Sequence, residues 1–499
     1  MNLQIPYMIP LLTFITLLFL VRVLNKRIRK PGKLPPGPRK LPIIGNLHQL
    51  GKLPHRSLQK LSQTHGDLMS LHLGFQPALV VSSAEKARDI FKHHDLAISS
   101  RPAVYAIGKI CYNFSCVSSA PYGAYWREAR RIVVVELMTA KRVDSFRHIR
   151  AEEVARMIEF ISGTAPDPVD LSSAVFAMSN SIVSRAAFGK EGGGGGDGKG
   201  RSFLEIFREA QKFVGEFNVA DYFPGLDWVN RINGVDRRIA ENFRDLEGFF
   251  ERVIGEHRDR AVEDSGEGDI IDVLLRVQKQ SELTDDQLKA ILMDVFIAGT
   301  DTSVSIIVWI MAELIRNPTA RQKAQRQVRE IAKGKPMVEE SDLPNLPYLK
   351  QVIKEAFRLH PPAPLLIPRE TTEPCTIDGG RYHIPAKTRV FFNVAAMSTD
   401  PTVWENPREF SPERFEDSGV DYRGQHFELL PFGAGRRGCP GISFSVPVVE
   451  LTVANLLLRF DWKLPEGMSE EDVDMEEAIG VTIHKKVPLC LVACSVNNY

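Results

Sequence analysis

A single cysteine in a loop of glycines and arginines, just ahead of an apolar helical run, is the feature that most constrains this chain. The stretch is Phe432-Gly433-Ala434-Gly435-Arg436-Arg437-Gly438-Cys439-Pro440-Gly441. Glycines let backbone N–H groups turn towards the sulfur and arginines add positive charge, and both lower the pKa of a thiol. Cys439 is therefore a candidate metal ligand. The alternative is a small buried apolar residue that opens a helix, as most lone cysteines are.

Two glycine patterns imitate nucleotide-binding loops. Gly433, Gly435 and Gly438 spell GxGxxG, but no strand–helix–strand unit with a distal acidic residue surrounds them. Residues 193–199 fit GxxxxGK, but Gly200 follows in place of Ser or Thr, and no strand precedes. We expect neither loop to bind a nucleotide, and we expect residues 191–200 to be a connector without a fold of its own.

The cysteine loop resembles that of the haem-thiolate monooxygenases, the cytochrome P450 superfamily, whose pattern is Phe-x-x-Gly-x-Arg-x-Cys-x-Gly. Every fixed position is matched. The resemblance implies that Cys439 is the proximal ligand to the iron of haem b, that Phe432 packs against the ligand loop, and that Arg437 pairs with a haem propionate. Thiolate ligation favours cleavage of the O–O bond of dioxygen.

A capping box at Thr284-Asp285-Asp286-Gln287 predicts a helix of roughly 32 residues that ends at Asn317-Pro318. Its middle reads Ala298-Gly299-Thr300-Asp301-Thr302-Ser303, where a glycine and an acid interrupt an apolar helix. On pattern alone, a kink with a capped hydroxyl and a ligand-binding turn explain this stretch equally well. The resemblance extends to it, and implies that Ala298 and Gly299 line the distal haem face while Asp301 and Thr302 relay protons during oxygen activation.

Three further motifs match the family. Trp126 and Arg130 stand four residues apart and so share a helix face. The resemblance makes both of them, together with Arg369, partners of the haem propionates. Glu355 and Arg358 stand three apart, and an exposed pair of this kind contributes little. The resemblance implies instead a buried structural lock made of Glu355, Arg358 and Arg414, with no chemical role.

The substrate pocket is expected from four segments. Residues 101–124 have no clean period and predict a long irregular loop, which in the family covers the substrate. A helical stretch broken at Phe223-Pro224-Gly225 would form the roof, and residues 363–369 and 478–482 would complete the walls. For any one loop residue, ordinary packing is an even alternative. The expected pocket residues are Tyr105, Ile107, Ile110, Phe114, Phe213, Phe217, Val219, Leu365, Leu366, Ile367, Ile479 and Val481.

The N-terminus predicts a membrane anchor at residues 1–24. Residues 5–21 are uncharged and mostly apolar, reach roughly 26 Å as a helix, and precede a basic cluster. A cleaved signal peptide is the alternative, but the charges follow the apolar run and no clear small-x-small site appears. The positive-inside rule then orients the rest of the chain to the cytosol. Residues 25–40 would form a basic, proline-rich hinge, and residues 41–499 the haem-thiolate catalytic domain.

The fold class expected from the resemblance is mainly α with small β-sheets, the cytochrome P450 fold. Residues 68–82 predict a β-hairpin, and Ser83 precedes a helix that ends near His93 and His94. A net charge of +1 gives no electrostatic reason to bind nucleic acid, and the six cysteines form no CxxC pair that would indicate zinc or a disulfide framework.

The arrangement most resembles plant microsomal, A-type members of the seventy-one clan. That implies a monooxygenase of specialised metabolism in the endoplasmic reticulum membrane, which oxidises an apolar small molecule. A terpenoid is the first expectation, with an alkaloid or phenylpropanoid next. Electrons would come from NADPH through a separate flavoprotein reductase, with cytochrome b5 as a further partner, docking near Arg436, Arg437, Arg127 and Arg131. The alternatives are a haem-thiolate isomerase or dehydratase that needs no reductase, and a non-catalytic haem or ligand-binding protein.

Overall fold

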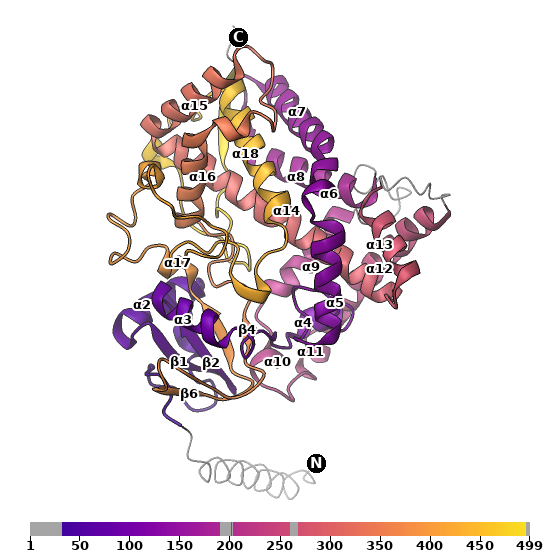
Figure 1. Cartoon of the computed structure of the whole chain (residues 1–499), viewed down its shortest axis with the longest axis vertical. Helices are drawn as coiled ribbons and strands as arrows, with labels where there is room; N and C mark the ends of the chain where they lie inside the picture. Colours follow the sequence, from indigo (N-terminus) through magenta and orange to yellow (C-terminus); the bar gives the residue numbers. More distant parts are fainter. Residues whose placement is uncertain (1–31, 190–200, 202, 260–267, 496–499) are drawn as a thin grey trace, which may run out of the picture.

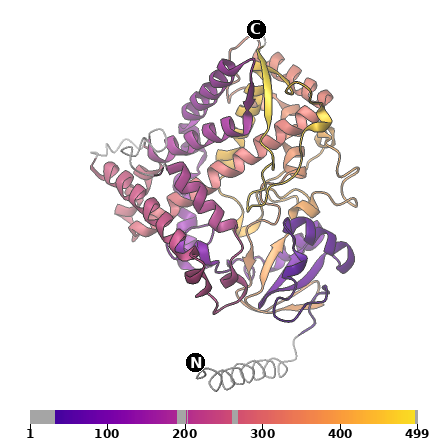
Figure 2. The ribbon, with the colours of Figure 1, turned by 180° about the vertical axis from the view of Figure 1, so that it is seen from behind.

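The structure is a computed structural model that describes residues 32–189, 201, 203–259 and 268–495. A large helical body lies above a smaller part made of strands and short helices (Figure 1), and the view from behind shows the same division (Figure 2). The expected class, mainly helical with small sheets, is confirmed. The anchor expected at 1–24, the first residues of the hinge and the glycine-rich connector lie outside the described residues.

Helix α14 (Asp285–Arg316) crosses the middle of the helical body and packs on α8 and α18. The other helices of the body are α5 (Ala124–Ile132), the π-helix Val133–Leu137, α6 (Ala140–Ser145), α7 (Arg147–Thr164), α8 (Leu171–Phe188), α13 (Ile270–Gln280), α15 (Pro318–Ala332), α16 (Pro347–Leu359) and α18 (Ile442–Arg459).

The long helix begins and ends where the sequence predicts. Thr284 Oγ1 accepts a hydrogen bond from the Gln287 N–H at 3.2 Å, and Gln287 Oε1 accepts one from the Thr284 N–H at 3.0 Å. Pro318, which lacks a backbone donor, starts α15 directly after it. Most of α14 is buried, and its exposed or partly exposed residues lie at its two ends and in its middle, so its stability comes mainly from packing.

The roof of the helical body is interrupted as expected near residue 224. It consists of α9 (Phe203–Gly215), α10 (Val219–Tyr222), α11 (Val229–Ile232) and α12 (Val235–Asp259). The segment expected to be irregular throughout, residues 101–124, contains one short helix, α4 (Tyr105–Ile110). Three consecutive residues after it, Tyr112, Asn113 and Phe114, have left-handed φ angles, which breaks any regular period.

The largest sheet has the order β1-β2-β7-β4, with β2 and β7 parallel and the other neighbours antiparallel. The predicted hairpin is confirmed as β1 and β2, and the Ser83 hydroxyl caps α3 by accepting from the Lys86 N–H. The strands are β1 (Leu68–Leu73), β2 (Gln76–Val81), β7 (Arg389–Phe392), β4 (Arg369–Glu370), β3 (Pro168–Asp170), β9 (Cys490–Ser495), β8 (Phe460–Lys463), β5 (Cys375–Ile377) and β6 (Tyr382–Ile384). Short helices complete the fold: η1 (Leu47–Gln49), α2 (Pro54–His65), α3 (Ala84–His94), η3 (Leu343–Asn345), α17 (Val394–Met397), η4 (Pro412–Phe415), η5 (Gly435–Arg437) and η6 (Glu470–Asp472).

The described part of the proline-rich hinge, residues 32–40, contains no helix or strand, as its prolines dictate. It nevertheless packs on the sheets. The Ser70 N–H and hydroxyl donate to the carbonyls of Pro36 and Pro35, and the His383 N–H donates to that of Lys33. These residues are thus part of the packed domain, ahead of the boundary that we expected at residue 41.

Two described helices, α14 and α18, are long and apolar enough to cross a membrane. About two thirds of each apolar window (67%) is buried inside the protein, however. Their apolar character therefore reflects their place in the core.

Candidate functional site

The cysteine loop turns back on itself just before α18. The Cys439 N–H donates to the carbonyl of Phe432 at 2.9 Å, and the Gly441 N–H points at Cys439 Sγ at 3.3 Å. Gly435 has φ of +65°, and a Cβ there would lie 2.4 Å from a carboxylate oxygen of Asp95, so only glycine fits. The loop therefore presents one sulfur with an N–H donor directed at it.

The pKa of the Cys439 thiol is raised, because burial outweighs the lowering by the Gly441 N–H and by Arg130. We expected the glycine N–H groups and the arginines of the loop to lower this pKa. The Gly441 N–H does so, the arginine that contributes is Arg130 of α5 and not one of the loop, and burial outweighs both. A thiol of this kind becomes a thiolate when a cation binds to it.

Three arginines beside this loop have no acidic partner in the described part of the chain. Burial, then the neighbouring guanidinium groups, lowers the pKa of Arg101 and of Arg437, the latter to about 9. Burial also lowers the pKa of Arg130. Their acceptors are all backbone carbonyls: Ser118, Ile367 and Pro368 for Arg101, Gly438 for Arg130, and Ser99, Val117 and Ala120 for Arg437.

Trp126 lies under this arginine cluster. Its ring is 4.1 Å from the guanidinium carbon of Arg437, and its Nε1–H donates to the carbonyl of Val117 at 3.1 Å. Arg437 is thus turned inward, and it does not belong to the exposed docking surface that we expected to include it. Arg127, Arg131 and Arg436 are exposed.

Arg369, also expected at the propionates, is already paired. Its guanidinium is 3% exposed, lies 2.9 Å from Asp95 and donates to the carbonyl of Ala434 at 2.7 Å. Asp95 also binds the Arg436 side chain at 2.8 Å. In the described structure, Arg369 and Asp95 fix the ligand loop to α3 and β4, and a propionate contact of Arg369 stays a prediction.

Helix α14 is open in its middle, around one turn. Ala298 is exposed and Gly299, Asp301 and Thr302 are partly exposed, whereas residues 303–315 after this turn are buried. The Ser303 and Ser445 hydroxyls lie 3.3 Å apart, so this turn lies close to the part of α18 that follows Cys439. A flat group between the cysteine loop and Ala298 would cover both.

Gly299 is explained by helix packing. A Cβ at this position would meet a methyl group of Val183 on α8 at 3.1 Å. Its missing side chain therefore lets α8 approach α14, whereas the open face of this turn belongs to Ala298.

Asp301 and Thr302 are both held by hydrogen bonds. The Thr302 hydroxyl donates to the carbonyl of Ala298 at 2.7 Å. Oδ1 of Asp301 lies 3.0 Å from Nε2 of His484. Sequence reasoning missed His484. It lies two positions after the predicted turn at 478–482 and 183 positions from Asp301, and no local sequence pattern indicates that the two side chains meet.

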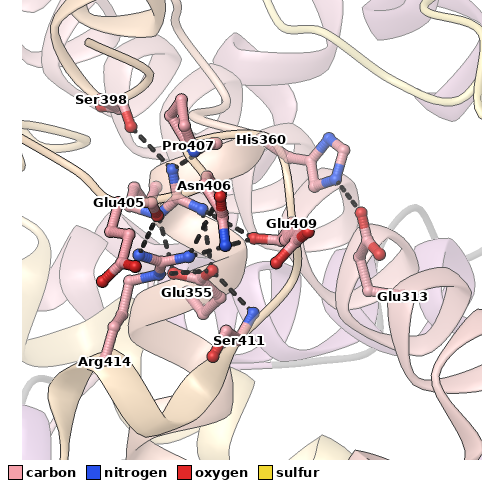
Figure 3. A network of polar contacts seen from close by, with 11 residues as sticks. Glu313, Glu355, His360, Ser398, Glu405, Asn406, Pro407, Glu409, Ser411 and Arg414 are labelled. Carbon is pink, nitrogen blue, oxygen red and sulfur yellow. Dashed lines mark hydrogen bonds and ion pairs between the residues drawn. The ribbon is translucent and has the colours of Figure 1, made fainter. Parts of the chain in front are cut away.

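The structure brings the three lock residues together (Figure 3). Glu355 lies 2.7 Å from Nε of Arg358 and 2.9 Å from Nε of Arg414, and Arg358 also donates to three carbonyls of the surrounding loop. Glu355 and Arg358 are fully buried. Beside the lock, His360 lies 2.7 Å from Glu313 and stacks on Trp309, which ties α16 to α14.

The expected pocket residues differ in exposure. Exposed apolar side chains in the segments at 363–369 and 478–482 are those of Ile367 (42%), Ile479 (66%) and Val481 (47%). Leu365 and Leu366 instead pack against two separate apolar clusters of the sheet region.

Two expected pocket residues of the segment after α3 have specific partners. The Tyr105 hydroxyl donates to Asp236 of α12, and burial followed by this contact raises its pKa to about 12. The Phe114 ring lies on Gly108. Of the other candidates, Ile110 and Phe213 are buried, Ile107 and Val219 are partly buried, and Phe217 is 63% exposed and stacks on Tyr222.

Asp294 is a further residue that the sequence did not indicate. Its carboxylate accepts from the Ser118 N–H at 3.2 Å, and burial raises its pKa to about 6 against the opposing effect of that hydrogen bond and of Arg101. It ties the loop at 115–120 to α14, one turn before Ala298.

The residues present fit a haem group. A partly exposed thiol with an N–H donor can take iron, and an exposed alanine in the middle of a mostly buried helix leaves room for a flat ring. Buried charges are normally paired, and Arg101, Arg130 and Arg437 have no carboxylate in ion-pair contact. These three guanidinium groups therefore form a suitable binding site for an anion. The two propionates of haem have this charge.

Comparison with known proteins identifies the family of the chain. The family model described as "Cytochrome P450" matches residues 35–491. The chain is similar to strychnine-11-hydroxylase of Strychnos nux-vomica (57% identical, covering 92% of this chain and 91% of the relative). It is also similar to cytochrome P450 71A9 of Glycine max (54%, 96% and 97%) and to premnaspirodiene oxygenase of Hyoscyamus muticus (43%, 97% and 97%).

A solved structure of a zebra fish cytochrome P450 with progesterone has the same fold. Its TM-score is 0.75, and it covers 88% of this chain and 99% of its own. At 23% identity the likeness concerns the fold alone.

Proposed function

The chain belongs to the cytochrome P450 family and is a cytochrome P450 monooxygenase, and from this premise we propose that it oxidises a polycyclic, mainly apolar plant metabolite. The oxidant is dioxygen, and the electrons come from NADPH through a separate flavoprotein reductase. The observation that carries this proposal is the group of three arginines without acidic partners beside the thiol of Cys439.

The haem is held between the cysteine loop and α14. Cys439 would supply the thiolate that binds the iron, Phe432 would support the loop, and Ala298 would leave room for the ring. Arg101, Arg130, Arg437 and Trp126 hold the propionates, and Arg369 strengthens the loop from behind. Bound haem supplies the iron at which dioxygen is reduced and activated.

Asp301 and Thr302 deliver protons to the distal side. Both are on the open turn of α14, where a carboxyl and a hydroxyl group can pass protons inward from water. Thr302 is held by the Ala298 carbonyl, so its oxygen keeps lone pairs directed away from the helix axis.

The substrate lies against apolar side chains that remain exposed in the expected pocket segments. Ile367, Ile479 and Val481 come from two segments that are far apart in the sequence, and the tip of the second contacts α9 at Gly215. The 57% identical relative is named for strychnine, an alkaloid, and the 43% identical relative for premnaspirodiene, a terpene. A polycyclic alkaloid is therefore the first class to test, and a terpenoid, the class first expected from the sequence, is the second.

The catalytic domain works at the cytosolic face of the endoplasmic reticulum. Large apolar side chains are exposed near the start of the described chain and on the roof: Leu41, Ile43, Phe75, Trp228 and Ile232. The ring centroids of Phe75 and Phe223 are 5.5 Å apart, so the start of the chain and the roof are in contact here. The two regions together form one apolar face that suits a membrane surface. Arg127, Arg131 and Arg436 offer an exposed basic surface to the reductase.

The test is reconstitution of the full chain with a plant reductase in microsomes. Strychnine and premnaspirodiene are added in turn, and binding is followed by the spin-state shift of the Soret band. We expect a shift and an oxygenated product that requires NADPH. Product without NADPH would point to a reductase-free isomerase or dehydratase, and ligand binding with no product under any condition would refute the enzymatic proposal.

A further inference from the structure

Asp301 of α14 is hydrogen-bonded to His484, which lies in the loop that carries the expected pocket residues Ile479 and Val481. Nε2 of His484 is 3.0 Å from Oδ1 of Asp301. The two side chains are 33% and 18% exposed, so the contact lies at the edge of accessible space. In the part of the chain that the structure describes, this is the hydrogen bond that the Asp301 carboxyl group makes with another side chain.

Further contacts fix the same loop on the same face of α14. The Ser305 hydroxyl and the Trp309 Nε1–H both donate to the carbonyl of Ile483, at 2.7 and 3.0 Å. Asp301, Ser305 and Trp309 are spaced four residues apart, so they form one stripe along the helix. The residue before His484 is therefore fixed to the helix that carries Asp301.

The other end of the loop is fixed as well. The Ala478 N–H donates to the carbonyl of His484 at 2.8 Å, which closes the loop on itself. Glu477 lies 3.0 Å from His55 and 2.7 Å from Arg56, both on α2, and the pKa of Glu477 is lowered to about 2 by these partners despite its burial. Only the tip at 479–482 is left to respond to a bound molecule.

The geometry points to His484 as a positioning residue for oxygen activation. We propose that it holds the Asp301 carboxyl group in the orientation for proton delivery, and that it couples this orientation to the substrate-contacting tip at 479–482. The inference rests on the proposed function, in which Asp301 relays protons. Without His484 one oxygen of Asp301 loses its partner, and the carboxyl group is free to rotate.

Failure to deliver protons at the right position can be measured as hydrogen peroxide that forms in place of product. When delivery fails, dioxygen that has taken up two electrons leaves with two protons as hydrogen peroxide, and no product forms. The variant to test is His484→Phe, which keeps a ring of similar size but has no hydrogen-bonding nitrogen. His484→Gln restores a donor at similar reach, and Lys486→Gln, which breaks an exposed ion pair of the same loop with Glu476, is the matched control.

Each full-length holoenzyme is assayed with reductase and strychnine, and product and hydrogen peroxide are both measured per NADPH consumed. For His484→Phe we expect product per NADPH to fall about tenfold, a part of what a positioned general acid supplies, with a matching rise in peroxide. His484→Gln should recover most of the loss, and Lys486→Gln should match the wild type. Wild-type coupling in His484→Phe would overturn the inference. A wild type that forms no product would refute the proposed function instead.

A second measurement does not depend on turnover. Hydrogen exchange of residues 476–486 is compared in the wild type, His484→Phe, Asp301→Asn and the double variant. We expect each single change to speed exchange and the double variant to add nothing further, because both remove one contact. Additive effects, or no effect of either, would overturn the inference whether or not a substrate has been found.

Discussion

Buried arginines occur in two places in this molecule, and their partners differ. In the lock, Arg358 and Arg414 share the carboxylate of Glu355, and loop carbonyls take the remaining N–H groups (Figure 3). Beside Cys439, Arg101, Arg130 and Arg437 donate to carbonyls only. Burial, followed by the neighbouring guanidinium groups, lowers the pKa of Arg101 and of Arg437.

The difference separates a structural element from a binding site. A guanidinium group that is paired with a carboxylate needs nothing further, and taking that carboxylate away leaves an uncompensated buried charge. Several guanidinium groups that face one another with no carboxylate in ion-pair contact repel each other until an anion arrives. The lock therefore stabilises the chain by itself, whereas in the function that we propose the arginine cluster is completed by the haem propionates.

The largest effect is expected in the lock. Glu355→Gln leaves two guanidinium groups without a counter-charge, so the free energy of unfolding should fall by about 3–5 kcal/mol. Urea unfolding followed by circular dichroism measures it. The matched control is Glu476→Gln, whose partner Lys486 is exposed, and its effect should stay below about 1 kcal/mol. If both changes lowered the free energy of unfolding by the same amount, the lock would contribute no more to stability than an exposed ion pair.

The next effect concerns Asp294, the acid that faces the arginine cluster. Its pKa is raised from 3.8 to about 6 because burial outweighs the attraction of Arg101. An acid with a raised pKa in the folded protein binds an extra proton on folding. Its contribution to stability is therefore complete below about pH 4 and is lost as the pH rises through 6.

Asp294→Asn keeps an acceptor for the Ser118 N–H and removes this titration. The stability of the wild type relative to Asp294→Asn should fall by about 3 kcal/mol between pH 4 and pH 7. Chemical unfolding of both proteins at several pH values measures the difference. A difference that does not change with pH would contradict the raised pKa.

The smallest effect is expected for a single arginine of the cluster. Arg130→Gln removes one charge-assisted partner of a propionate, worth about 1.5–3 kcal/mol, so haem loss to apomyoglobin should become at least about tenfold faster. Arg127→Gln, on the exposed side of α5, should leave the rate unchanged. The haem-free Arg130→Gln protein should be at least as stable as the wild type, because one source of repulsion is gone. Faster haem loss from both variants alike would argue against a specific contact.

Local signals in the sequence were sufficient for the elements that carry the site. The capping box at Thr284 and the proline at 318 define α14, and the serine before α3 and the turn between β1 and β2 were equally clear. In each case the residues that decide the structure are neighbours in the chain. The identity of Cys439 as a candidate ligand also follows from its immediate surroundings.

Other features depend on contacts between distant segments, and sequence reasoning missed or misjudged them. His484 meets Asp301 only after the C-terminal loop packs on α14. Gly299 seemed to make room for a ligand, but its missing side chain admits Val183 of α8. Arg437 looked like part of an exposed basic surface, yet it is turned inward onto Trp126. Spacing along the chain does not say which way such side chains point.

The most direct test of the account is the spectrum of the reduced carbonyl complex after Cys439→Ala. The control is Cys490→Ala, because Cys490 is exposed on β9. We predict that the thiolate-type spectrum of the wild type persists in Cys490→Ala and disappears in Cys439→Ala. A thiolate-type spectrum that survives in Cys439→Ala would contradict the assignment of the ligand, and with it the reading of the arginine cluster as the propionate site.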